Sequence, residues 1–325
     1  MKIKQELTKM GLYIVKKSLK ESIKDYLNEL KPQVKNNWLT VGSIYVVMTI
    51  VFSVLFLIDA LIFKFGLSSL VSMVMLLMYG SSNYWSVLLG MSAVIISLVL
   101  LIILEVFAFY IVVALQFGLQ DVDQGAQLKV SFQDTWRRIK QMNKNQLLRL
   151  YAYNSLFIFL WLLPVMILQS LFGSNQIVVH CLQAAGFLIL VRKSLDYSQA
   201  IFLYREYQPH FLGQSQRYAL KASQRFMKGN KGNLLGQLVL AVIPLALWGA
   251  IWGAVTYFGF YIWEPIMIYG GPVIGVLGVC FYLPLFQLVL VKFYAQHKNQ
   301  KLLETAFRKT FKPVAQLTGE AYKKR

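Results

Sequence analysis

Residues 213–250 read GQSQRYALKASQRFMKGNKGNLLGQLVLAVIPLALWGA and pass from a basic amphipathic half directly into an apolar half. In the first half, basic residues recur at spacings of four, four and three, which places them on one stripe of a helix. These residues are Arg217, Lys221, Arg225 and Lys228. The run at 229–233 breaks the helix, because glycine and asparagine tolerate the backbone angles of a sharp turn. The stretch predicts a helix on a membrane surface followed by a helix that enters the membrane.

Apolar residues elsewhere in the chain are also gathered in long blocks. Hydrophobic residues make up 57% of the 325 residues, and the mean hydropathy is +0.53. A block of about 20 apolar residues can cross the roughly 30 Å hydrocarbon core of a bilayer. The composition therefore predicts an all-α, polytopic integral membrane protein with six transmembrane helices. The predicted spans are residues 39–63, 84–117, 150–171, 177–191, 234–257 and 273–293.

The net charge of +19 is concentrated in four segments between or beside these spans. Nine of the 33 basic residues lie in 1–38, six in 118–150, eight in 192–233 and nine in 292–325, and Lys64 is the remaining one. Because basic residues favour the cytoplasmic side of a membrane, this alternation predicts that both termini are cytoplasmic. It also explains the basicity without nucleic acid, which we do not expect as a partner.

The chain divides into an amphipathic N-terminal helix within 1–38, a six-span membrane domain at 39–293 and a basic tail at 294–325. Residues 65–83 are too short an apolar segment to cross comfortably, so we expect a re-entrant or surface segment there.

Three similar elbows, beginning near residues 34, 142 and 227, each join a basic amphipathic stretch to a span. This pattern predicts three helical hairpins in series, with amphipathic interfacial helices leading into them.

Two acidic residues lie inside predicted spans, where a carboxylate is costly unless it has a partner or a task. Asp59 lies near the end of the first span and close to Lys64, and we expect it to be a hydrated charge. Glu105 lies deeper, between Leu104 and Val106. It could bind a cation, relay a proton, or accept a hydrogen bond from a tyrosine or serine. Glu105 is therefore a candidate intramembrane polar site.

No catalytic, metal-binding or cofactor motif is present in the sequence. His180 and Cys181 are neighbours, but no third ligand lies at metal-site spacing. The three histidines, at 180, 210 and 297, form no recognisable triad, and HExxH is absent. We therefore expect no catalytic residues, no metal, no cofactor and no enzymatic activity.

The run from Ala219 to Lys231, with Lys221, Ser223, Phe226 and Gly229 at fixed positions before a span, resembles a family signature. It is similar to the six-helix membrane domain of Gram-positive glycerophosphodiester phosphodiesterases and to related stand-alone bacterial membrane proteins. The resemblance covers residues 30–295 and implies a bacterial plasma membrane location. The catalytic domain of those phosphodiesterases uses a divalent cation and carries His-Arg-Gly and Glu-Asn-Thr strings, which this sequence lacks.

These features favour a non-catalytic membrane module that engages anionic lipid headgroups, or that anchors or assists another membrane protein or a separate enzyme. The four-residue basic stripe is the candidate headgroup site, although fixing the orientation of the chain explains it equally well. The alternative function is a small transporter or channel, whose solute would pass near Glu105 and the kinks at Pro164 and Pro244.

Overall fold

The computed structural model describes residues 37, 39–72, 84–172 and 175–312. All regular elements in these ranges are helices. The predicted N-terminal amphipathic helix and the far end of the tail, residues 313–325, lie outside them.

Six helices in the described residues are long and apolar enough to cross a membrane, which confirms the predicted all-α class and number of spans. Every one extends beyond its predicted bounds. They are Leu39–Ser72, α2 (Tyr84–Asp123), α4 (Lys144–Leu171), α5 (Gln176–Tyr197) with its near continuation α6 (Ala200–Glu206), α8 (Lys231–Ile262) and α9 (Pro265–His297).

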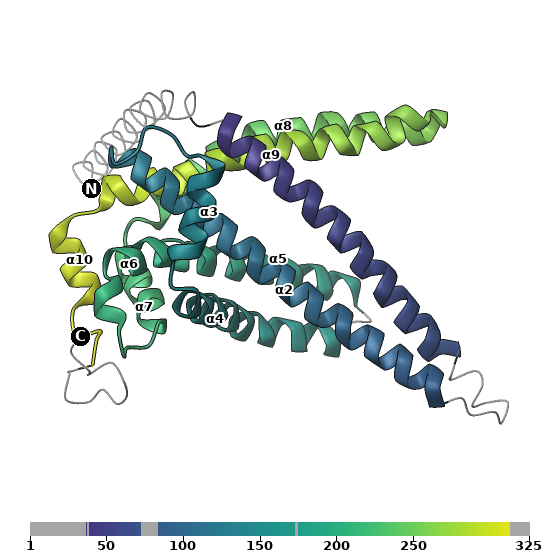
Figure 1. Ribbon diagram of the computed structural model, residues 1–325, viewed down its shortest axis with the longest axis horizontal. Coiled ribbons are helices and arrows are strands. Elements are labelled where there is room, and N and C mark those ends of the chain that lie inside the picture. The colour runs from purple at the N-terminus through teal and green to yellow at the C-terminus, as the bar shows by residue number, and fades with distance from the viewer. Residues whose placement is uncertain (1–36, 38, 73–83, 173–174, 313–325) are drawn as a thin grey trace, which may run out of the picture.

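The shorter helices gather at one end of the molecule, which we call the base (Figure 1). From the base the long helices extend outward, and the far end of α2 lies well apart from the far ends of α8 and α9 (Figure 1). The base contains α3 (Phe132–Gln141), α6, η1 (Gln208–Phe211), α7 (Arg217–Phe226) and α10 (Gln300–Phe307), together with the ends of the long helices that pack on them.

The hydrophobic core lies in the base. Fully buried aromatic residues come from four elements, and Phe202 of α6 stacks on Tyr294 of α9 with ring centroids 5.4 Å apart. Phe226 packs on the same tyrosine. Outside the base, the long helices leave most of their leucine, isoleucine, valine and phenylalanine side chains exposed. Because a protein in water buries such surface, its exposure here fits a lipid solvent around the long helices.

One correction concerns residues 65–72, where we expected a surface segment. The first helix continues without a break past Lys64 to Ser72. Its serines satisfy their hydroxyls within the helix, since Ser68 donates to the Phe65 carbonyl and Ser72 to the Ser68 carbonyl. A Cβ on Gly66 would lie 2.9 Å from the Gly90 carbonyl oxygen of α2, so the two helices approach closely at this level. The expected re-entrant segment beyond residue 72 lies outside the described residues.

The elbow between α7 and α8 overlaps the predicted break at 229–233 only in part, since residues 231–233 already belong to α8. The chain turns at Gly229, whose φ of +89° is strained for residues with a Cβ, and α8 begins at Lys231. At the preceding elbow, the Asn143 side chain caps α4 by accepting from the Gln146 amide.

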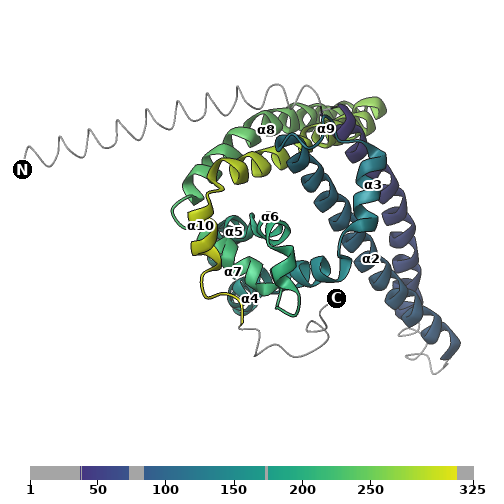
Figure 2. The same cartoon turned by 60° about the vertical axis from the view of Figure 1, so that its left-hand side comes forward.

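Helices α8 and α9 run side by side along their lengths (Figures 1 and 2). Their approach depends on glycines of α9. The Trp248 indole of α8 donates to the Gly275 carbonyl at 3.1 Å and lies over Gly278, where a Cβ would overlap its ring. Glycine at these positions therefore allows α8 and α9 to pack closely.

Ion pairs connect elements of the base that are distant in the sequence. Asp121 of α2 accepts from Arg138 of α3 and from Arg205 of α6. Asp123 of α2 pairs with Lys292 of α9 at 2.6 Å. Between α5 and α8, Asp196 pairs with Lys231. Within the base, these ion pairs thus connect α2 to α3, α6 and α9, and α5 to α8.

Candidate functional site

Helix α7, which carries the basic stripe, follows a turn at Gly213 with φ of +72° and has polar and apolar residues on opposite faces. Its apolar face was expected to rest on a membrane surface. That face is instead buried in the base, through side chains that include Ala219, Leu220 and Phe226. Ser223 on the same face donates to the Asp196 carbonyl of α5 at 2.7 Å. Helix α7 is therefore held by protein, and its basic side remains outward.

The four predicted headgroup residues have three different environments. Arg225 is committed within the protein, because its Nη1 donates to the Ala306 and Arg308 carbonyls at 3.1 and 2.8 Å. The same nitrogen donates to Thr310 Oγ1, so Arg225 caps the end of α10. Lys228 is exposed just beyond the end of α7.

Arg217 and Lys221 are exposed one turn apart and line the same groove.

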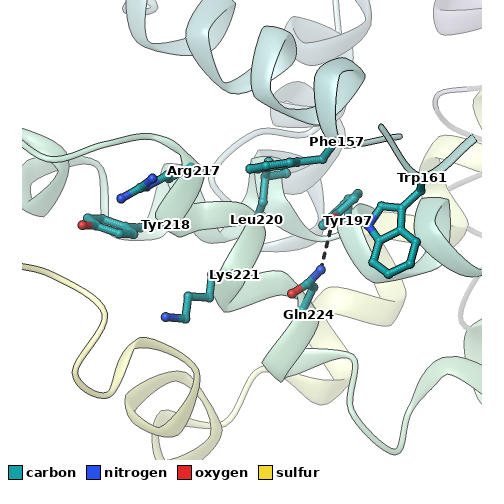
Figure 3. Close-up of a pocket in the computed structure, with 8 residues that line it drawn as sticks. All are labelled: Phe157, Trp161, Tyr197, Arg217, Tyr218, Leu220, Lys221 and Gln224. Carbon is teal, nitrogen blue, oxygen red and sulfur yellow. Dashed lines mark hydrogen bonds between the residues drawn. The ribbon is translucent and has the colours of Figure 1, made fainter. Parts of the chain in front are cut away.

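This groove has a volume of about 420 Å³ and lies between α4, α5 and α7. Figure 3 shows Arg217 and Lys221 toward one side of it and Trp161 of α4 toward the other. Between these two sides, the Gln224 amide of α7 donates to the Tyr197 hydroxyl of α5 at 3.1 Å, and this hydrogen bond joins the two helices. The remaining lining residues are Phe157, Tyr218 and Leu220.

The groove combines positive charge with an aromatic surface. Neither Arg217 nor Lys221 has an acidic partner among the described residues. Near the other side, the Lys193 ammonium lies 3.7 Å from the centroid of the Trp161 ring. Tryptophan and lysine together are typical of the membrane–water interface. A phosphate could bind the two cations while apolar chain atoms contact the Trp161 and Phe157 rings.

Glu105 lies on α2 and accepts a hydrogen bond from the Tyr151 hydroxyl of α4. The sequence left three roles open for Glu105: binding a cation, relaying a proton, or accepting a hydrogen bond. The structure shows the third, with a tyrosine as the donor. Glu105 also lines a cavity of about 1000 Å³ between the Leu39–Ser72 helix, α2 and α9. Pro164 and Pro244, where kinks were expected, lie inside continuous helices and do not line this cavity.

Asp59 differs from its prediction as a hydrated charge. Its side chain is only 2% exposed, and its Oδ1 is buried without a hydrogen-bond partner among the described residues. Ser97 of α2 is also fully buried, and its hydroxyl has no hydrogen-bond partner within the described ranges. Sequence position alone suggested hydration, since Lys64 is five residues away, but packing within the protein leaves the Asp59 side chain almost no exposed surface.

Burial in the base also affects the pKa of Tyr207, which lies between α6 and η1. Desolvation, reinforced by the nearby Glu206 and Glu304 carboxylates, raises the pKa of its hydroxyl. Tyr207 stacks against Phe307 of α10 and so belongs to the packing of the base.

No group of three metal-ligating side chains occurs among the described residues. His180, one of the residues considered for a metal, lies 3.3 Å from the Gln183 side-chain oxygen. Comparisons with known protein families, curated proteins and solved structures found no match.

Proposed function

We propose that this protein is a non-catalytic membrane module that binds anionic lipid headgroups in the groove beside α7. The observation that carries the proposal is the groove itself, in which Arg217 and Lys221, which have no acidic partner among the described residues, line the same volume of about 420 Å³ as aromatic side chains. Headgroup phosphates are held well by such cations. Within the predicted four-residue stripe, Arg217 and Lys221 then bind lipid, Arg225 maintains the fold, and Lys228 contributes only surface charge.

The wider proposal places the protein in a bacterial cell membrane, with the base and both termini in the cytoplasm. The four basic segments support this orientation. Three hairpins in series, with amphipathic helices leading into them, would then expose their far ends on the outer side. The resemblance of residues 219–231 to the signature of the phosphodiesterase membrane domain is the basis for also proposing a role in anchoring or assisting another membrane protein or a separate enzyme.

The experiment compares two doubly substituted proteins with the same loss of charge. Arg217→Gln with Lys221→Gln removes both groove cations, whereas Lys228→Gln with Lys301→Gln removes two exposed cations of the base outside the groove. Binding of phosphatidylglycerol to the purified proteins in phosphatidylcholine nanodiscs is measured by native mass spectrometry. At about 1 kcal/mol per cation, we expect the groove variant to bind about tenfold or more weakly.

The control variant should retain most of the binding. Equal losses in the two variants would contradict a groove and leave only a general attraction of the basic surface to anionic lipid. Unchanged binding in both would overturn the lipid proposal.

A second candidate function, passage of a small solute, is favoured by one observation. Glu105, an acidic residue in a long apolar helix, lines the cavity between the first helix, α2 and α9. Its test is the flux of a solute or cation into liposomes that contain the protein.

A further inference from the structure

The cavity of about 1000 Å³ between the Leu39–Ser72 helix, α2 and α9 carries a negative charge in its lining. Glu105 lines the cavity and keeps exposed surface, and neither lysine nor arginine is among the lining residues. Glu105 also forms no ion pair within the described ranges. A carboxylate in a long apolar helix is costly without a partner. The described part of the chain thus leaves this charge without a counter-charge.

A hydrogen bond from α4 orients the Glu105 side chain. The Tyr151 hydroxyl donates to Glu105 Oε1, and the Tyr151 ring packs on Phe109 of α2 with ring centroids 4.5 Å apart. Tyr151 itself is not among the residues that line the cavity. A carboxylate can accept through both of its oxygens, so this bond leaves capacity for a second partner. The partner that orients the carboxylate is neutral, and the negative charge remains available to a ligand.

Aromatic rings lie at the same level as the carboxylate. The rings of Phe52 and Phe107 stack with centroids 6.2 Å apart, which sets the register of the first helix against α2. The two helices run in opposite directions, so Glu105 lies at the level of residue 54, between Phe52 and Phe56. Both phenylalanines line the cavity. Because the face of an aromatic ring attracts cations, a cation beside Glu105 would be bound by both kinds of group.

The rest of the lining favours a large organic ligand over a metal ion. Most of the lining is apolar and comes from residues such as Met48, Leu101 and Leu104. Thr49 is already engaged, since it hydrogen-bonds to Cys280 of α9 at 3.0 Å. A metal ion such as Mg²⁺ or Ca²⁺ needs several oxygen ligands, which this lining does not gather. Apolar and aromatic walls with few polar groups are typical of pockets for drug-sized molecules.

We propose that this cavity binds a lipophilic organic cation, of the quaternary ammonium or phosphonium class. The positive charge lies beside Glu105 and between the Phe52 and Phe56 rings, and the apolar groups of the ligand contact leucine side chains of the lining. Charge selects this ligand, because an acyl chain leaves the carboxylate unpaired and an anionic lipid is repelled by it. The site is separate from the groove at α7, and binding here does not require that the cation crosses the membrane.

The test compares tetraphenylphosphonium with tetraphenylborate, an ion of the same shape and opposite charge. The purified full chain in phosphatidylcholine nanodiscs is equilibrated with each ion by dialysis, and empty nanodiscs correct for partition into lipid. We expect saturable binding of the cation and none of the anion. Absence of saturable tetraphenylphosphonium binding, or equal binding of the two ions, would overturn the proposal.

Two variants with the same change of charge locate the site. Glu105→Gln keeps the size of the side chain and should weaken tetraphenylphosphonium binding by about tenfold or more, because the ligand loses its counter-charge. Glu304→Gln, at an exposed position on α10, should bind as the unaltered protein does. If Glu105→Gln binds as tightly as Glu304→Gln, the proposal fails.

A third variant tests the aromatic contact without disturbing the fold. Phe56 is 58% exposed, so Phe56→Leu removes a ring from the cavity without opening the core. It should weaken binding by about threefold. Unchanged binding in Phe56→Leu would contradict the proposal, whatever the folding of Glu105→Gln. The Arg217→Gln, Lys221→Gln protein should bind the cation normally, which separates this site from lipid binding in the groove.

Discussion

Asp121 is the residue whose loss should weaken the base most. Its carboxylate is 16% exposed and faces Arg138 and Arg205, which are 13% and 27% exposed. Asp121→Asn preserves the shape of the side chain but leaves two guanidinium groups facing each other without a counter-charge. Removing one partner of a buried ion pair costs about 3 to 5 kcal/mol.

The expected loss lies near the lower end of that range, because both arginines keep other acceptors. Arg205 still donates to the Phe117 carbonyl and to Gln120, and Arg138 still donates to Gln127. We therefore expect the free energy of unfolding to fall by about 3 kcal/mol. At about 2 to 4 °C per kcal/mol for a larger domain, Tm should fall by about 6 to 12 °C.

The assay is thermal unfolding of the purified protein in one detergent. The matched control is Asp134→Asn on α3, which removes an exposed pair with Arg137 and should cost at most about 1 kcal/mol. Asp121→Asn combined with Arg138→Gln should recover part of the loss, because one of the two facing charges is gone. If Asp121→Asn is no less stable than Asp134→Asn, the ion pairs do not hold the base together and the reasoning is wrong.

Two further predictions concern the long helices. Gly278→Ala should destabilise the protein by about 1 to 3 kcal/mol, because the new Cβ overlaps the Trp248 ring. Gly270→Ala has open space around it and should be neutral or slightly stabilising in the same thermal assay. Equal stability of the two variants would show that α8 and α9 do not pack as described. If the chain conducts a cation or couples solute passage to protons, Glu105→Gln should abolish flux into liposomes while Tyr151→Phe, which keeps the carboxylate, should retain it. The absence of flux in the unaltered protein would remove transport as a candidate function.

The architecture of the long helices could be predicted because lipid imposes a strong and local rule on sequence. A helix that crosses a membrane must be apolar over most of its length, so the six blocks were visible without any tertiary information. The ends were less predictable. The first helix, for example, continues beyond Lys64 through Ser68 and Ser72, whose hydroxyls bond to its own carbonyls, and hydropathy does not register this way of accommodating serine.

The candidate site was predicted only in part, because a periodic stripe describes one helix and not its neighbours. The spacing of the four basic residues does not distinguish one from another. Arg225 nevertheless donates to carbonyl groups at the end of α10, which lie more than eighty positions later in the sequence. Trp161 and Phe157 enter the groove from α4, and no local signal links them to Arg217. Likewise, the burial of Asp59 depends on residues distant in the sequence and could not be inferred from its neighbours along the chain.

The ion pairs of the base also impose an order on biogenesis. Asp123 leaves the ribosome long before its partner Lys292, and Asp196 before Lys231. The pairs of long helices can enter the membrane one after another, but the base cannot close until α9 has been made. Until then, Asp123 cannot form its ion pair with Lys292, and the aromatic surface that Tyr294 later covers stays exposed. Truncation before α9 should therefore leave an inserted chain that quality-control proteases recognise at its unfinished base.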